Sequence, residues 1–216
     1  MEPKIRQIRT GGISFLQRLA GSPDWCWGTD YTSGDLYEAE ELYRDGRRIR
    51  QNRLIFVHLP DGRVAEPVRA REGQYFGVPV CDGGTPVLLL ADFPAGELRL
   101  LRYHDESGTV SPVVALPRGA VEDCYNLMPH CAPLCLTRQT AERFQIVWPE
   151  RADFAIHPAE SFCIRDGERL YFSRWYEDPD YREELVVRRF PDGEIMEQRR
   201  GALCEMPDGR QWLLTE

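Results

Sequence analysis

Residues 53–68 read RLIFVHLPDGRVAEPV, and the fold is inferred outward from this stretch. The apolar run LIFVH leads into the turn Pro60-Asp61-Gly62, and a second run, interrupted by Pro67, follows it. Asp-Gly supplies the positive φ angles that a tight hairpin turn requires. The stretch therefore predicts two antiparallel strands joined by a short turn.

The same unit recurs along the chain. Four further stretches share its form: KIRQIRTGGISFL (4–16), LRLLRYHDESGTVSPVV (98–114), RFQIVWPERADFAIHPA (143–159) and ELVVRRFPDGEIMEQ (184–198). The turns, centred on Gly11, Gly62, Gly108, Ala152 and Gly193, are spaced by 51, 46, 44 and 41 residues. Because a four-stranded propeller blade takes roughly 40–45 residues, each unit is interpreted as the outer hairpin of a blade.

The sequence between these hairpins supplies two further strands for each blade. The paired stretches are 25–34 with 36–44, 75–84 with 85–93, 124–130 with 133–139, 161–167 with 169–177, and 202–209 with 211–216. The chain begins with an outer hairpin and ends with an inner pair, so the two ends are expected to complete one blade together. We thus predict an all-β fold: a five-bladed β-propeller of four-stranded antiparallel blades, closed by the N- and C-terminal strands, in one domain over residues 1–216.

Proline placement supports this interpretation, because proline cannot donate to a strand ladder and is confined to edges, strand starts and bulges. Pro67, Pro112 and Pro158 fall in predicted outer edge strands, and Pro79 and Pro129 fall in predicted inner edge strands. A β-sandwich or barrel with coincidental spacing is the alternative fold. Within the first blade, the polar stretch LYEAEELYRDGRRIRQ (36–51) could form a short helix in place of a strand.

This pattern of repeats resembles a small five-bladed propeller, and it is similar to the tachylectin-2 type of lectin in blade count and length only. No lectin signature is copied from blade to blade. The resemblance therefore implies a propeller fold and assigns no binding residue.

Composition excludes several classes of protein. The chain has 27 Lys and Arg against 35 Asp and Glu, a net charge of −8, which is the wrong sign for a protein that neutralises nucleic-acid phosphates. No apolar run reaches the roughly 18 residues of a membrane helix, and no signal-peptide pattern follows Met1. Seven cysteines without a spaced framework favour free thiols. We expect an acidic, soluble, cytoplasmic protein that binds neither membrane nor nucleic acid.

Loop lengths distinguish the two faces of the predicted disk. One face carries tight turns, and the other carries longer connections, where binding residues tend to concentrate. On the longer-loop face the segment 174–183 offers flat aromatic rings beside hydrogen-bonding groups, a combination suited to a sugar or a peptide. The predicted ligand-binding residues are Trp175, Tyr176, Asp178, Asp180 and Tyr181.

The cysteines are interpreted as packing residues. Cys26, Cys124, Cys163 and Cys204 fall near the starts of predicted inner strands, where small buried residues are favoured. A soft-metal ring is the competing interpretation. The segment 124–135 gathers Cys124, His130, Cys131 and Cys135, yet strand alternation would split them between faces. We predict no metal and no cofactor.

Two functions compete. The favoured one is a non-catalytic binding or scaffold module for an unidentified glycan, peptide or small molecule. The alternative is a carbohydrate-active hydrolase, which would need two inner-strand carboxyl groups, one as general acid and one as base or nucleophile; the candidates are Asp30, Asp123 and Glu160. No nucleophile, metalloprotease or phosphate-binding motif accompanies them. The oligomeric state is left open.

Overall fold

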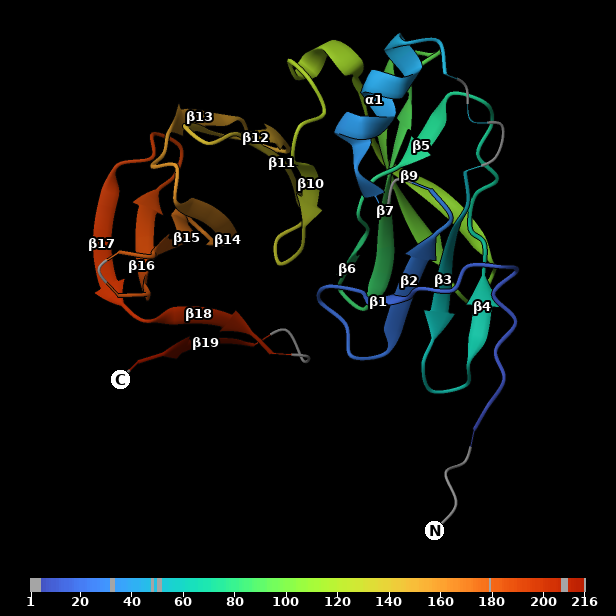
Figure 1. Ribbon diagram of the computed structural model, residues 1–216, viewed down its shortest axis with the longest axis horizontal. Coiled ribbons are helices and arrows are strands. Elements are labelled where there is room, and N and C mark those ends of the chain that lie inside the picture. The colour runs from blue at the N-terminus through green and yellow to red at the C-terminus, as the bar shows by residue number, and fades with distance from the viewer. Residues whose placement is uncertain are drawn as a thin grey trace.

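The computed structural model describes residues 5–31, 34–47, 49, 52–178, 180–206 and 210–215. It is a propeller of antiparallel sheets, and it has four blades where five are predicted (Figure 1). In each four-stranded path the spatial order of the strands follows the chain order. A central cavity is bordered by residues at the start of each sheet, namely Ala20 and Gly21, Val80 and Cys81, Met128 to His130, and Cys163 and Ile164, so the early strands of each sheet are the inner ones.

Blade 1 contains β1 (Gln17–Arg18), β2 (Trp25–Thr29), β3 (Leu54–His58) and β4 (Arg63–Ala65). Its inner strand is thus the end of the N-terminal stretch, and the predicted inner strand 25–34 is instead the second strand. The connection from β2 to β3 carries a helix, α1 (Leu36–Arg44). The carboxylate of Asp35 accepts hydrogen bonds from the amides of Tyr37 (2.9 Å) and Glu38 (3.1 Å) and so caps this helix.

Blade 2 is the largest, with β5 (Gln74–Phe76), β6 (Val80–Asp82), β7 (Thr85–Asp92), β8 (Glu97–His104) and β9 (Thr109–Pro117). Both β5 and β6 pair with β7, one at each end, so together they form an inner strand that is interrupted around Pro79. Pro112 lies in β9, the outer edge of the sheet. The predicted edge position of these two prolines is confirmed.

Blades 3 and 4 follow the predicted strand order. Blade 3 has β10 (Leu127–His130), β11 (Cys135–Gln139), β12 (Arg143–Trp148) and β13 (Ala152–Ala155). Blade 4 has β14 (Glu160–Asp166), β15 (Arg169–Tyr176), β16 (Arg182–Arg189) and β17 (Ile195–Arg200). A two-stranded hairpin, β18 (Ala202–Glu205) and β19 (Gln211–Leu214), ends the chain.

The predicted fifth blade does not form. The N-terminal residues 5–16 make no strand, and Ile13 is buried against Ile55 and Val57 on the face of blade 1 that turns away from blade 2. The C-terminal hairpin remains a separate two-stranded sheet. A hydrogen bond from the Gly21 amide to Glu205 Oε1 (3.2 Å) links this hairpin to blade 1. The N-terminal segment covers blade 1 because its apolar side chains, such as Ile13, pack against the apolar side chains of β3.

The core lies in layers between successive blades. In β7, Leu88 and Leu90 pack toward blade 1, whereas Val87, Leu89 and Ala91 pack toward α1 and blade 3. A third layer, rich in phenylalanine, joins blades 3 and 4. Full burial of one large apolar side chain contributes about 1.5–3 kcal/mol, so these layers fix the blades and the turns that they carry.

Candidate ligand pocket between blades 1 and 2

The residues predicted to bind a ligand lie at the connection between β15 and β16. Trp175 and Tyr181 are 43% and 67% exposed, and Asp178 and Asp180 are also exposed. Tyr176 is half-buried: its ring lies under the guanidinium of Arg182 (4.1 Å), and its hydroxyl donates to Glu184 (3.3 Å). The aromatic rings are thus available on the surface, and ligand binding there stays a prediction.

The candidate hydrolase residues have structural partners in separate places. Asp30 accepts from the amide of Arg53 (2.7 Å), and Asp123 accepts from Arg138 (2.7 Å). Burial raises the pKa of Asp123, but hydrogen bonds from the Tyr125 amide and from Arg138 outweigh it and leave that pKa lowered. Glu160 is buried between Arg174 and Arg188.

The cysteines divide among different layers, as strand alternation requires. Cys124 packs between blades 2 and 3, and Cys135 packs between blades 3 and 4. Burial raises the pKa of both thiols to about 12, so they are protonated at neutral pH. All seven cysteines are free thiols, and in the described part of the chain no three His, Cys, Asp or Glu side chains converge as metal ligands.

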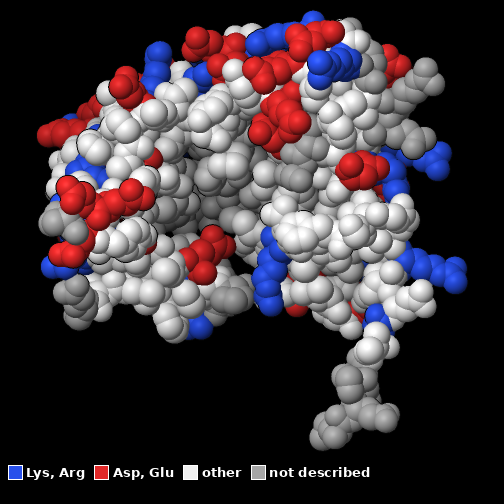
Figure 2. All heavy atoms as spheres, viewed as in Figure 1, with Lys and Arg blue, Asp and Glu red and all other residues white. Residues whose placement is uncertain are grey.

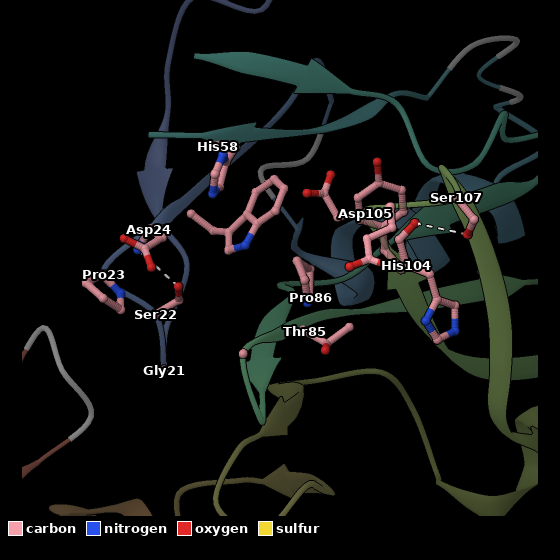
Figure 3. A pocket seen from close by; sticks show the side chains of 14 residues that line it. Gly21, Ser22, Pro23, Asp24, His58, Thr85, Pro86, His104, Asp105 and Ser107 are labelled. Carbon is pink, nitrogen blue, oxygen red and sulfur yellow. Dashed lines mark hydrogen bonds between the residues drawn. The ribbon is translucent and has the colours of Figure 1, made fainter. Parts of the chain in front are cut away.

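The largest cavity described, about 660 Å³, opens between blades 1 and 2 on the face of tight turns, opposite the face where a ligand is predicted (Figure 3). Four segments form its wall: the β1–β2 turn from Gly21 to Trp25, the end of β3 at His58, the start of β7 at Gly84–Pro86, and the end of β8 with its turn at Tyr103–Ser107. We call this cavity the inter-blade pocket.

The β1–β2 turn is held in place by glycine and by local hydrogen bonds. Gly21 has φ +82°, and a Cβ there would lie 2.5 Å from the carbonyl oxygen of Cys81. The Asp24 amide donates to Ser22 Oγ (3.1 Å), and the Asp24 carbonyl accepts from the Leu59 amide (2.7 Å). The backbone of Asp24 is therefore fixed while its carboxylate is exposed at the rim.

An aromatic wall lies beside this rim. Trp25 is 6% exposed, and its ring packs against His58 (centroids 4.8 Å apart) and, edge to face, against Tyr103 (6.4 Å). Trp25 therefore packs between blades 1 and 2, and its remaining surface faces the inter-blade pocket. Burial, followed by the neighbouring charge of Asp105, raises the pKa of the Tyr103 phenol.

Three carboxylates, Asp24, Asp105 and Glu106, border the inter-blade pocket, and neither Lys nor Arg is among its described lining residues. Asp105 forms an ion pair with Arg63, which approaches from β4. Asp24 and Glu106 are exposed, and no ion pair is found for either in the described ranges. The pocket therefore combines uncompensated negative charge with an indole surface.

Sequence reasoning missed the inter-blade pocket because it treated the Asp-rich turns as purely structural and took residues 20–24 for a longer-face loop. The turn Asp105-Glu106-Ser107 does carry a signal: it holds two adjacent acids, whereas the Pro-Asp-Gly turns hold one. Of the carboxylates predicted for a hydrolase, Asp30, Asp123 and Glu160 do not line this pocket.

A second cavity, about 440 Å³, is the central channel, which is seen as a hollow near the middle of Figure 2. It is bordered by Cys81, His130 and Cys163 from three inner strands and by Glu205 from the hairpin. Burial lowers the pKa of His130 to about 4, so its imidazole is neutral at physiological pH. Gly21 and Gly84 border both cavities, so the β1–β2 turn is part of the wall between them.

No protein-family model and no curated protein matches this chain. A solved structure, named "putative 6-phosphogluconolactonase" and from Bacteroides uniformis, aligns with 88% of this chain and 60% of its own, at 12% identity and a TM-score of 0.42. The chain thus spans 60% of the length of that structural neighbour. No helix of the described residues is both long and apolar enough to cross a membrane.

Proposed function

We propose that this chain is a non-catalytic binding module, and that the inter-blade pocket binds the positively charged end of its ligand. An ammonium or guanidinium group of a basic peptide or of a small amine is the ligand chemistry that fits. The observation that supports this proposal is the set of three carboxylates around one cavity, with no Lys or Arg among the described lining residues.

The physical basis is charge and surface type together. A cation gains from hydrogen bonds to carboxylates, which are stronger when both partners are charged. A cation over an indole face gains a further 0.5–2 kcal/mol or so, depending on how far it is desolvated. Asp24 and Glu106 can supply the first contribution and Trp25 the second, and the net charge of −8 attracts cations over longer range.

The structure favours binding over the hydrolase alternative. Asp30, Asp123 and Glu160 each hold a backbone or arginine partner, and none of them borders the inter-blade pocket. A cytoplasmic location remains a prediction from sequence. The exposed patch around Trp175 and Tyr181 is a second candidate surface, and it fits a neutral or polar ligand such as a glycan.

Titration with arginine amide and with tetramethylammonium chloride, followed by Trp fluorescence and by NMR, tests the proposal, with glucose as an uncharged probe. We expect both cations to bind, with an affinity that falls as salt is added, and glucose not to bind. The double variant Asp24→Asn/Glu106→Gln should weaken cation binding at least about tenfold, which corresponds to 1.4 kcal/mol.

Asp166→Asn/Glu168→Gln is the matched control, since it also removes two negative charges, and Asp166 and Glu168 are exposed acids of blade 4 outside the inter-blade pocket. Cation binding that is equally weakened by this control would show that net charge alone is responsible and would contradict the proposal. Binding of glucose that is lost in Asp178→Asn/Asp180→Asn would move the site to the longer-loop face.

A further inference from the structure

The C-terminal hairpin is half a blade. The four blades each contain at least four strands, whereas the hairpin has two, and within the described residues β19 pairs only with β18. Figure 1 shows β19 at the rim of the molecule, with no strand on its outer side. An isolated two-stranded hairpin is only marginally stable, and the unpaired backbone groups of an edge strand can form hydrogen bonds with another strand. We therefore expect another strand to pair with β19.

The hydrogen-bond pattern shows which backbone groups face outward. The Met206 amide donates to the Arg210 carbonyl (2.7 Å). Antiparallel partners alternate between hydrogen-bonded and non-bonded pairs, so Trp212 and Leu214 direct their N–H and C=O groups toward β18. Gln211 and Leu213 direct theirs away from it, which leaves the outer edge of β19 free to form a ladder.

β19 also lacks the features that protect the outer edges of the four blades. Edge strands in proteins that do not aggregate usually carry a charge or a proline. The outer strand of every blade has at least one such residue, for example Arg63 in β4, Pro112 in β9, Asp153 in β13 and Glu197 in β17. The strand β19, QWLL, has neither.

Apolar side chains accompany the open edge. Trp212 and Leu214, which lie on the same face of β19, are 49% and 50% exposed. They are two of the eleven exposed large apolar residues found in the described chain. An apolar surface of this kind on a folded domain marks an interaction site.

We propose that a second copy of this chain completes the half-blade. Two β19 strands would pair antiparallel about a two-fold axis, with the order β18-β19-β19-β18, so that two molecules side by side share one four-stranded blade. With Leu213 opposite the partner subunit's Leu213, the outward N–H and C=O groups of the two residues bond each other. Trp212 then lies opposite the partner subunit's Leu214, at a pair where side chains approach most closely.

A second copy fits this edge better than an unrelated strand for two reasons. The pattern is self-complementary, because the same residue at the axis serves both molecules, as an isologous interface requires. The segment from Gln211 to Leu214 has no charged side chain, so no like charges meet across the axis. The shared sheet would also have four strands, as each blade has along its main path.

Sedimentation equilibrium of the full chain tests this proposal. We expect a dimer that dissociates on dilution, and a monomer for Trp212→Lys/Leu214→Lys, since this variant places lysines opposite lysines. Ile195→Lys/Met196→Lys is the matched control on another edge strand, β17, with similar exposure (40% and 51%); it should remain a dimer.

Charge complementation tests the register itself. Trp212→Glu/Leu214→Glu should also be monomeric, and an equimolar mixture with the lysine variant should form a heterodimer, because each lysine then faces a glutamate. If the variants do not fold, as judged by near-UV circular dichroism, the wild-type Leu213 amide should still exchange more slowly as protein concentration rises. A wild-type monomer at every concentration, or a mixture that does not associate, would overturn the proposal.

Discussion

The strands β7 and β19 have similar apolar content and very different surroundings. In β7 every residue except Thr85 is buried, because its two faces pack against blade 1 on one side and against α1 and blade 3 on the other. In β19 no residue is buried. A propeller strand therefore gains most of its stability from neighbours that pack on both faces of its sheet. A terminal strand of similar composition gains little because it lacks these neighbours.

The largest loss of stability is expected for Glu160→Gln. This substitution tests whether blade 4, which adjoins the hairpin, is packed as tightly as the other blades. Glu160 is 1% exposed and accepts from Arg188 Nε (2.9 Å) and Arg174 Nε (3.0 Å). Glu160→Gln leaves two buried guanidinium groups without a counter-charge, so we expect a loss of about 3–5 kcal/mol in urea unfolding.

Glu197→Gln is the control for this substitution. Glu197 pairs with Arg199 on the surface of β17, and such a pair contributes about 0–1 kcal/mol. If the two variants were equally stable, the ion pairs of Glu160 would contribute no more than a surface pair. Blade 4 would then resemble the loosely packed hairpin rather than the other blades.

The next prediction compares the loss of stability when a leucine is truncated in β7 and in β19. Leu89→Ala in β7 removes a fully buried side chain and should cost about 2–5 kcal/mol. Leu214→Ala in β19 removes one that is half exposed and should cost less than about 1 kcal/mol at protein concentrations too low for association. Equal losses in urea unfolding would show that the hairpin is packed as well as the interior.

A smaller effect on the free energy of unfolding depends on pH and arises from His130, which borders the central channel. Because the pKa of His130 is lowered to about 4 in the folded protein, the unfolded chain binds a proton at His130 that the folded chain does not. Stability from this residue is therefore complete above about pH 6.5, the ordinary His pKa, and is lost as pH falls toward 4.

The comparison of wild type with His130→Phe isolates this contribution, since carboxylates titrate in both proteins. The Phe variant should lose less stability between pH 6.5 and 4, as measured by thermal unfolding across that range. His157→Phe, at an exposed position, should follow the wild type. Parallel profiles for all three proteins would contradict a lowered pKa of His130.

A modest effect is expected even when the whole hairpin is deleted. Removing residues 202–216 takes away the hairpin, in which no described residue is buried, and its contact at Gly21. We expect the four blades to unfold cooperatively and to lose less free energy than Leu89→Ala does, as measured by urea unfolding at low protein concentration. A loss greater than that of Leu89→Ala would mean that contacts of the hairpin with blades 1 and 4 contribute substantially to the stability of the propeller.

The sequence predicted the hairpins that repeat in the interior, because Asp-Gly turns and edge prolines are local signals. Gly62, Gly108 and Gly193 do adopt positive φ in the turns between the two outer strands of their blades. The error lies at Gly11, which also has positive φ but joins no strands. Local pattern does not say which surface an apolar segment will cover, and residues 5–16 cover blade 1.

The candidate site was harder to predict for a related reason. The inter-blade pocket depends on which turns are brought together by the packing of blade 1 on blade 2, and Asp24 and Glu106 are far apart in sequence. The helix α1 was foreseen only as an alternative, although Asp35 and the acidic first turn are ordinary start signals. Reading the Asp-Gly turns as structural was reasonable, but it directed attention to the other face.

The agreement between chain order and spatial order within the sheets bears on how the molecule reaches its fold. Apart from β2 and β3, which are connected through α1, each strand pairs with one that is a short loop away, so the entropy lost in closing most of these loops is small. Proteins rich in such local pairings have low contact order and fold quickly. The contact between Gly21 and Glu205 joins residues 184 positions apart, yet it is a single hydrogen bond. The chain can therefore acquire its blades one after another as it leaves the ribosome, without waiting for its last residues.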